Sequence, residues 1–235
     1  MARRGRRRKR GWAGRVVLVL LLASGIAAVW LWWEGRQWKP SATTYADQGA
    51  YLTEDAGEVN FTTLRAIGAD FVYLRGSIGA DGKNTTFARS FEKAVAAGIP
   101  VGVVHVFDPC VSANTQSANF VVMVPRDAKL LPAAIELDKV ADDCPRRVSE
   151  AAVESELITL INQIEIHTGS PVLLKPGKRF ERRYPITAGF ERNLWLEQDW
   201  LEPDYAGRPW LMWTANDGLK TEASDEPLAW VVVRP

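Results

Sequence analysis

The sequence has few of the residues on which several kinds of chemistry depend. Its 235 residues include only two cysteines, two histidines and three methionines. It contains no His-Glu-x-x-His, Gly-x-Ser-x-Gly or glycine-rich phosphate-binding motif, and no Cys-x-x-Cys or His/Cys cluster. These absences argue against zinc hydrolysis, a serine nucleophile and nucleotide binding, because each of those chemistries needs such a spacing. We therefore expect no metal and no other cofactor.

The N-terminal segment has no acidic side chain before Glu34. Residues 1–15 carry eight basic side chains and no acidic one, and residues 16–33 carry no charge at all. At 1.5 Å per residue, this apolar run spans roughly 27 Å, close to the thickness of a bilayer core. Trp30, Trp32 and Trp33 lie at its far end, where indole rings favour the membrane interface. The pattern predicts a single-pass inner-membrane protein with a cytoplasmic basic segment, residues 1–15, a transmembrane helix, residues 16–33, and an extracytoplasmic or periplasmic main domain.

Two other interpretations of the N-terminus remain open. A basic block can bind nucleic acid, but the apolar span behind it favours a role in membrane topology. Without the eight N-terminal basic residues, 21 basic side chains face 28 acidic ones, so the remainder of the chain is a poor partner for a polyanion. The apolar run could instead be a cleaved signal peptide. It is longer than the usual apolar core of such a peptide.

The two cysteines, Cys110 and Cys144, permit one disulfide in an exported domain. Such a bond would close a loop of about 35 residues and add roughly 3–4 kcal/mol to the free energy of unfolding. The alternative is a pair of buried thiols.

After a polar tether, residues 34–48, strand-like and helix-like patterns alternate through residues 49–235. Short apolar runs predict eight strands, near 49–52, 70–75, 101–106, 133–138, 171–174, 193–196, 209–213 and 229–233. Apolar residues at helical spacing predict helices near 60–67, 84–97, 112–122 and 149–167. The alternation implies parallel strands joined by crossovers. We therefore predict an α/β fold, an irregular TIM-like (β/α) barrel of eight strands with fewer helices, preceded by the transmembrane helix.

In such barrels, functional residues lie where the strands end. The residues at these positions here are Arg75, His105, Asp108, Glu136, Asp138, Lys175, Glu197 and Trp213. Glu136 and Asp138 point to the same side of one strand, about 6.6 Å apart. When two carboxyls lie close together, the pKa of one is raised and that of the other is lowered. If both face an open cleft, such a pair supplies the proton donor and the anion that glycoside hydrolysis needs. Two solvated acids at a strand end would look the same.

Three of the other residues have both a structural and a functional interpretation. His105 ends an apolar strand and would ordinarily be a hydrogen-bonded core residue, with Asp108 close enough to orient it. Trp213 belongs to a group of five tryptophans in the last strands, and an indole ring there could stack on a sugar, although burial is the usual outcome.

Several segments in order resemble the family 25 glycoside hydrolases, lysozymes that cut the muramic acid–glucosamine bond of peptidoglycan. The segments are VNFTTLRAIGADFVYLRGSIG, FEKAVAAGIPVGVVHVF, SANTQSANFV, LPAAIELD and RPWLMW, which together extend over most of residues 49–213. The resemblance implies a muramidase that binds peptidoglycan glycan strands, with Asp138 at the general-acid position and Glu136 as its partner. It further suggests substrate contacts from His105, Tyr51, Arg75, Trp213 and Asp108.

The site residues of this chain differ from the family pattern. The family's Asp-x-Glu is reversed to Glu136-x-Asp138. Five further family positions are occupied by Tyr51, Ile78, Val104, Leu174 and Thr214. These differences leave open an inactive domain that only binds peptidoglycan or serves as a scaffold in the cell envelope.

Overall fold

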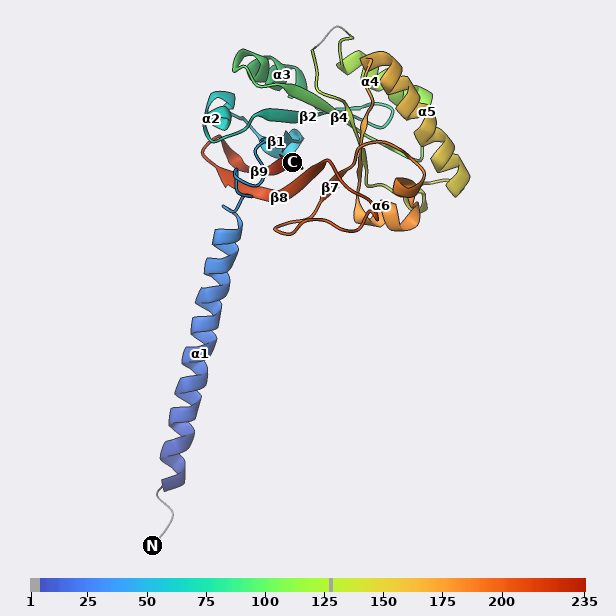
Figure 1. Ribbon diagram of the computed structural model, residues 1–235. Coiled ribbons are helices and arrows are strands. Elements are labelled where there is room, and N and C mark those ends of the chain that lie inside the picture. The colour runs from blue at the N-terminus through green and yellow to red at the C-terminus, as the bar shows by residue number, and fades with distance from the viewer. Residues whose placement is uncertain (1–4, 127–128) are drawn as a thin grey trace. The chain divides into compact units, whose positions relative to one another are not determined.

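The computed structural model describes residues 5–126 and 129–235 (Figure 1). The chain divides into two compact units, Met1–Trp38 and Lys39–Pro235. In the first unit, a single helix, α1, extends over Gly5–Gly35 and continues beyond both ends of the predicted span. Within it, Gly14–Gly35 is the one described segment long and apolar enough to cross a membrane by length and composition. Part of the basic segment, including Arg3 and Arg4, lies outside the described residues.

The second unit contains all eight predicted strands in one sheet. The strands are β1 Gln48–Leu52, β2 Phe71–Ile78, β4 Val101–Val106, β5 Ala134–Leu137, β6 Leu173–Pro176, β7 Trp195–Glu197, β8 Met212–Thr221 and β9 Ser224–Val233. They pair in the order β6-β5-β4-β2-β1-β9-β8-β7. A parallel bridge between Leu174 and Leu194 joins the two ends, so the sheet is a nearly closed barrel. A short additional strand, β3 Gly82–Lys83, pairs with β2.

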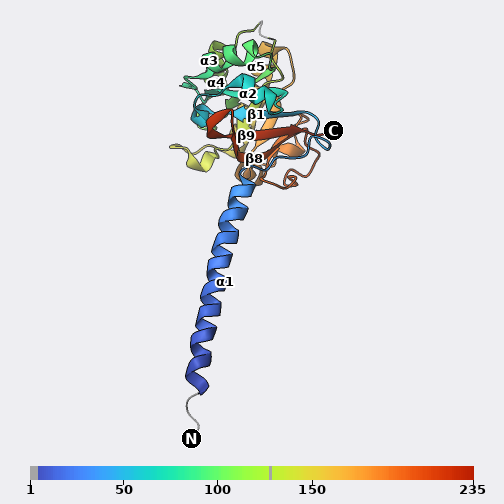
Figure 2. The ribbon, with the colours of Figure 1, turned by 90° about the vertical axis from the view of Figure 1, so that its left-hand side faces the viewer.

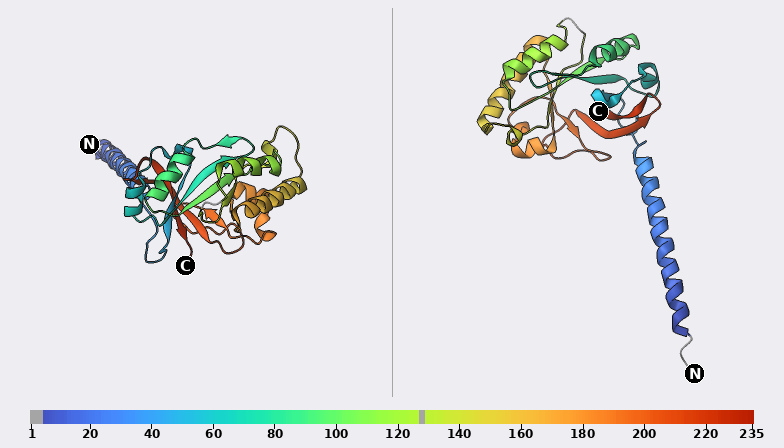
Figure 3. Two further views of the ribbon diagram at one scale, coloured as in Figure 1. Left: turned by 90° about the horizontal axis from the view of Figure 1, so that it is seen from above. Right: turned by 180° about the vertical axis from the view of Figure 1, so that it is seen from behind.

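Helices are present in the first part of the barrel and absent from the end of the described chain. They are α2 Phe61–Ala66, α3 Phe87–Ala96, α4 Ala113–Met123, α5 Glu150–Thr168 and α6 Lys178–Arg183, of which α6 was not predicted. Helices α3, α4, α5 and α6 lie outside the strands (Figures 1 and 3). Between Trp195 and Val233, all of which the structure describes, no helix forms. This confirms the prediction of an irregular barrel with fewer helices than strands.

One feature of the predicted topology is wrong. Strand β9 runs antiparallel to both of its neighbours, β1 and β8, and these three strands face the viewer in Figure 2. Only two residues separate β8 from β9, and so short a connection can join only antiparallel strands. The prediction of parallel strands holds for the pairs β1-β2, β2-β4, β4-β5 and β5-β6.

Local sequence explains the best-predicted helix. In α5, the hydroxyl of Ser149 accepts a hydrogen bond from the backbone N–H of Ala152 (3.2 Å) and caps the first turn. Gly169 ends the helix in the left-handed conformation (φ 72°), which glycine adopts without strain. The side chains that the periodicity assigns to the core are buried, namely Val153, Leu157, Leu160, Ile161 and Ile164.

The tether is shorter than predicted. Residues from Lys39 onward belong to the barrel unit. The Tyr45 ring is buried beside Trp210, with ring centroids 6.4 Å apart, and the Gln48 side chain accepts a hydrogen bond from Trp230 Nε1 (2.7 Å). Much of the polar stretch 34–48 is therefore packed against the last strands.

Candidate active site

The interior of the barrel is apolar below the site. Alternate residues of the parallel strands point inward, and a buried cluster there includes Tyr73, Val104, Ala134, Leu173 and Trp195. Moving two residues along a strand keeps a side chain on the same face. The next inward position on β5 is therefore Glu136, and the next on β6 and β7 are Lys175 and Glu197.

Glu136 lies at the centre of a buried hydrogen-bonded network. Its side chain is only 2% exposed. Oε1 accepts a hydrogen bond from Lys175 Nζ (2.8 Å), and Oε2 accepts from Arg75 Nη2 (2.9 Å) and from the Tyr51 hydroxyl (2.6 Å). Arg75 Nε also donates to the Tyr51 hydroxyl (2.9 Å) and thereby completes the network.

Two cations determine the charge of Glu136. Burial by itself would raise the pKa of this carboxyl. The charges of Lys175 and Arg75, together with hydrogen bonds from Lys175 and Tyr51, outweigh burial and lower the pKa to about 2. Glu136 is therefore a fixed anion at all ordinary pH values, and protein atoms surround it.

This network alters three of the predicted roles. The sequence predicted that Glu136 is a catalytic carboxyl if it faces an open cleft. Glu136 is buried and does not face one, so the prediction is wrong for this residue. Tyr51 is buried, and Arg75 is largely buried; Arg75 also pairs with Glu54 at 3.4 Å. We expected Tyr51 and Arg75 to contact substrate, but in this structure both bind Glu136.

Asp138, two residues further along the chain, is in the opposite situation. It follows β5, and its side chain is exposed. It has no hydrogen-bond or ion-pair partner among the residues that the structure describes. Surrounding protein desolvates the carboxyl and raises its pKa, and the negative charges of Glu136 and Glu197 add to this effect against the opposing charge of Lys175. A raised pKa in a carboxyl that solvent reaches is the property of a proton donor.

Gly177 makes room for Asp138. A Cβ atom at this position would collide with Asp138 Oδ1. The carboxyl therefore rests against bare backbone at the end of β6.

Glu197 supplies a second carboxyl that solvent reaches. Its side chain is 43% exposed, and Oε2 lies 2.7 Å from Lys175 Nζ. The Tyr205 hydroxyl accepts a hydrogen bond from the backbone N–H of Glu197 (3.1 Å) and donates one to the Pro176 carbonyl (2.8 Å), which fixes the end of β7 against β6. Lys175 thus bridges Glu136 and Glu197. The sequence identified both Lys175 and Glu197 as strand-end residues but assigned neither a role.

His105 lies on the other face of the sheet. Its register partner on β5 is Ile135, not Glu136, so its ring points outward toward α4. The ring is completely buried, with Nδ1 2.8 Å from Ser77 Oγ and Nε2 3.3 Å from Gln116 Oε1. Burial lowers the pKa of His105 to about 4, against a weaker opposing effect of the Gln116 hydrogen bond. His105 is a neutral core residue here, which corrects the expectation that it touches substrate.

Asp108 organises the loop after β4. Its Oδ1 accepts a hydrogen bond from the backbone N–H of Cys110 (2.9 Å), and its Oδ2 accepts one from Lys139 Nζ (2.8 Å). The Gln116 side chain also contacts its backbone N–H and carbonyl. Asp108 therefore does not orient the His105 ring directly. Both residues contact Gln116.

The loop that begins at Asp108 is also cross-linked. Cys110 and Cys144, 34 positions apart in the sequence, form a disulfide. Together with Asp108 they are the one group of three potential metal ligands found among the described residues. Sulfurs joined to each other are not available as thiolate ligands, so this group does not suit a metal.

Trp213 is buried. Its Nε1 donates a hydrogen bond to the Gln198 carbonyl (2.7 Å), and its ring lies 5.8 Å from Tyr45 and 5.9 Å from Trp210. The prediction that Trp213 lines a sugar groove is therefore not supported by its position. The exposed tryptophan near the barrel mouth is Trp200, which is 54% exposed and adopts a positive φ of 63°.

A nearly closed, irregular (β/α) barrel with acidic and basic side chains at the carboxyl ends of its strands carries its candidate site where barrel enzymes have their active sites. The sequence profile of the glycosyl hydrolases family 25 matches residues 52–218. The chain belongs to this family, which confirms the resemblance found in the sequence.

Individual relatives agree with this assignment. The chain is 26% identical over 101 residues to lysozyme M1 of Streptomyces globisporus, over 41% of this chain and 34% of that protein. The match thus spans about a third of the length of that relative. Among solved structures, a family 25 glycosyl hydrolase from Bacillus anthracis superposes with a TM-score of 0.76 at 19% identity, covering 85% of this chain and 93% of that one. A bacterial lysozyme from Streptomyces coelicolor gives 0.71 at 16% identity, with coverage of 80% and 92%. At these identities the structures show a shared fold.

Proposed function

We propose that this protein hydrolyses peptidoglycan glycan strands at the mouth of its barrel, with Asp138 as the proton donor. Family membership supports the reaction class, and the raised pKa of the exposed Asp138 carboxyl supports its role. Asp138 also occupies the general-acid position that the resemblance implied. The proposal depends on one observation, a raised pKa in an exposed carboxyl at the end of β5.

The proposed reaction uses two carboxyls that solvent reaches. Protonated Asp138 gives its proton to the glycosidic oxygen as the bond from that oxygen to the anomeric carbon breaks. A water molecule then adds to the anomeric carbon, and the Glu197 carboxylate accepts the proton that this water releases. Glu136 does not touch substrate. It holds Lys175 in place, and Lys175 in turn orients Glu197.

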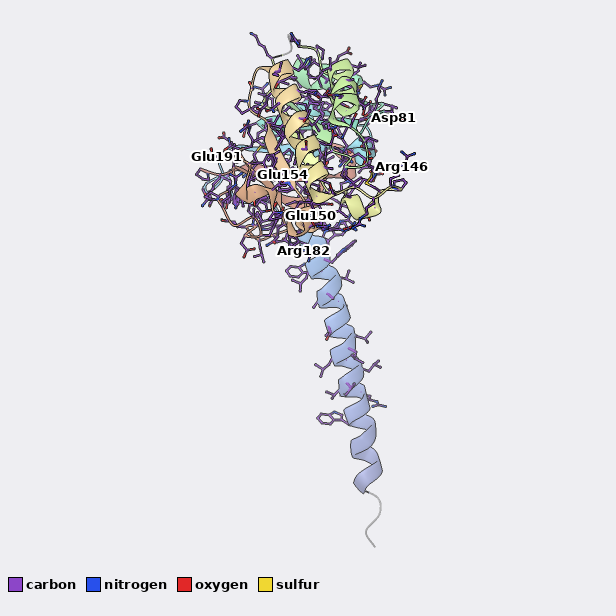
Figure 4. All side chains as sticks on the ribbon, turned by 90° about the vertical axis from the view of Figure 1, so that its right-hand side faces the viewer. Asp81, Arg146, Glu150, Glu154, Arg182 and Glu191 are labelled. Atoms are coloured by element: carbon purple, nitrogen blue, oxygen red, sulfur yellow. A yellow bond between two sulfur atoms is a disulfide. The ribbon has the colours of Figure 1, made fainter. Side chains whose placement is uncertain are left out.

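The test compares amide variants of Asp138, of Glu197 and of a control residue, Asp81. Asp138→Asn is expected to lower the release of reducing ends from purified cell walls by about 10²–10⁴-fold, the usual contribution of a positioned acid. Glu197→Gln should also impair release. Asp81→Asn is the matched control, because the Asp81 side chain is exposed at the surface (Figure 4) and has no part in the proposed reaction. Equal release by wild type and Asp138→Asn would contradict the proposal.

The position of Glu136 favours a second candidate, a domain that binds glycan strands without cutting them. A two-carboxylate mechanism that needs Glu136 is not available, because this acid is buried between Lys175 and Arg75. In that case the wild-type chain would sediment with insoluble peptidoglycan and release no reducing ends. Sedimentation together with release would exclude this candidate.

We further propose that α1 anchors the domain in the inner membrane, with the basic N-terminus in the cytoplasm. The length and composition of Gly14–Gly35 and the basic residues before it support this topology. The Cys110–Cys144 disulfide is consistent with an oxidising compartment outside the cytoplasm.

The anchor is tested by fractionation of cells that express the full chain. An uncleaved anchor keeps the 26.1 kDa chain in the membrane pellet after alkaline extraction. Protease added to spheroplasts should digest the barrel domain. A shorter, released species would indicate a cleaved signal peptide instead.

A further inference from the structure

A recess lies between α6 and residues 204–207. Its volume is about 630 Å³, within the range of roughly 300–1,000 Å³ that is usual for small-ligand sites. We call it the α6 pocket. None of the residues that the sequence predicted for the site lines it.

The α6 pocket lies next to the ends of β6 and β7. Gln198, which lines the pocket, directly follows Glu197 in the chain. Tyr205 also lines the pocket, and its hydroxyl bonds the backbone of Glu197 and Pro176 at the ends of β7 and β6. Tyr205 and Gln198 therefore place the pocket beside the strand ends that carry Lys175 and Glu197.

Charges of both signs surround the α6 pocket. Lys178 and Arg182 stand one helical turn apart on α6, and both are exposed. Lys178 Nζ donates a hydrogen bond to Gln198 Oε1 (2.8 Å), whereas Arg182 has no ion-pair partner among the described residues. Asp204, also exposed, contributes a carboxylate from the facing segment. Arg182 lies at the surface in Figure 4.

The wall of the pocket contains a carboxyl with incomplete hydrogen bonding. Glu181 is only 8% exposed, and its Oε1 accepts hydrogen bonds from the hydroxyl and backbone N–H of Thr187. Its Oε2 has no partner among the described residues. This oxygen is enclosed by protein atoms, so it belongs to the wall of the pocket and is not a contact for a ligand.

The rest of the lining is small and apolar. Pro185, Ala188 and Ala206 contribute carbon surface, and the Tyr205 ring lies 5.5 Å from Lys178 Nζ. Surface of this kind suits short alkyl side chains such as that of alanine.

We propose that the α6 pocket binds the peptide stem of peptidoglycan, with Lys178 and Arg182 contacting stem carboxylates and Asp204 contacting a stem amine. This inference rests on the proposed function, because the stem reaches the pocket from a glycan strand held at the mouth. A peptide with carboxylates, an amine and methyl side chains matches the lining in charge and in polarity. The site would make the protein selective for strands that carry stems.

The test measures binding of two soluble glycan probes to the full chain in detergent micelles. One probe is glycan strand with its peptide stems, and the other is the same strand after an amidase has removed them. All proteins carry Asp138→Asn, so that the probes remain intact. Binding is compared for this parent, for the parent with Lys178→Ala and Arg182→Ala, and for the parent with Arg179→Ala. Arg179 is the matched control, since it lies on the same helix but pairs with Asp143 and does not line the pocket.

The parent is expected to bind the stem-bearing strand about tenfold more tightly than the stripped strand, as charge-assisted hydrogen bonds of this kind would give. The double alanine variant should lose that preference, and the Arg179→Ala variant should keep it. Equal affinity of the parent for both probes would overturn the inference and leave the proposed function standing. A preference that survives the double substitution would also overturn it. Binding of neither probe would refute the proposed function itself.

Discussion

Replacing Lys175 with methionine tests whether the Glu136 network holds the barrel together. The substitution keeps most of the side-chain volume and removes the charge. In the wild type, Lys175 Nζ lies 2.8 Å from Glu136 Oε1 and 2.7 Å from Glu197 Oε2, and the lysine is only 5% exposed. Methionine would leave Glu136, itself 2% exposed, with Arg75 and Tyr51 as its remaining partners.

The expected loss follows from burial and distance. Two unit charges 2.8 Å apart attract by about 6 kcal/mol at an effective dielectric constant of 20, and part of this is offset by the cost of desolvating both groups. Removing one partner of a buried pair typically costs about 3–5 kcal/mol, because the other charge remains buried. Since Arg75 still pairs with Glu136, we expect the lower end, about 3 kcal/mol. For a chain of this size that corresponds to a fall in Tm of about 6–12 °C.

Thermal unfolding of the full chain in detergent, followed by tryptophan fluorescence, measures the effect. Lys178→Met is the control. Lys178 lies three residues away and is exposed, so its replacement should change the free energy of unfolding by no more than about 0.5 kcal/mol. If Lys175→Met unfolds within about 2 °C of that control, the network does not contribute to stability and the structural role assigned to Glu136 is wrong.

Three further predictions concern pH and the disulfide. Glu136→Gln should lower the free energy of unfolding by about 3 kcal/mol near neutral pH, since the pKa of Glu136 falls from 4.5 to about 2 on folding. Urea titrations at several pH values should show that the difference in stability between wild type and variant shrinks as pH falls from 4.5 toward 2. A difference that stays constant would contradict this prediction. Because folding lowers the pKa of His105 from 6.5 to about 4, the wild type should lose stability as pH falls from 6.5 toward 4. In His105→Gln, the free energy of unfolding should depend less steeply on pH over this range. An equally steep dependence would argue against a neutral buried ring. The double variant Cys110→Ala/Cys144→Ala should lose roughly 3–4 kcal/mol of the free energy of unfolding. It should unfold identically with and without reductant, whereas the wild type should become less stable when reduced. Equal stability of the two proteins under oxidising conditions would count against a stabilising cross-link.

Much of the barrel could be predicted from periodicity, because each strand and helix must bury one face. The run VGVVHV and the spacing of Val153, Leu157, Leu160 and Ile164 were sufficient to predict β4 and α5. The strand direction of β9 was not predictable in the same way. It depends on the two-residue connection after β8, and the extension of both strands beyond their apolar cores concealed how short that connection is.

Part of the candidate site could likewise be predicted from the sequence, and part could not. The sequence predicted that acids would end β5 and that Lys175 and Glu197 would end the adjacent strands. It could not predict that Lys175 and Arg75 would enclose Glu136, because that depends on which strands become neighbours. It also could not place His105 on the face opposite Glu136, which follows from the pairing of His105 with Ile135 between β4 and β5.

The sequence by itself determined the family, the order of the strands and helices, and the apolar span before the domain, because these depend on local pattern and on motifs in a fixed order. Tertiary structure alone decided which carboxyl is an enclosed anion and which is exposed with a raised pKa. Two acids separated by one residue acquire these different properties because long-range strand pairing, and not their own sequence context, brings cations to Glu136 and leaves Asp138 open to solvent.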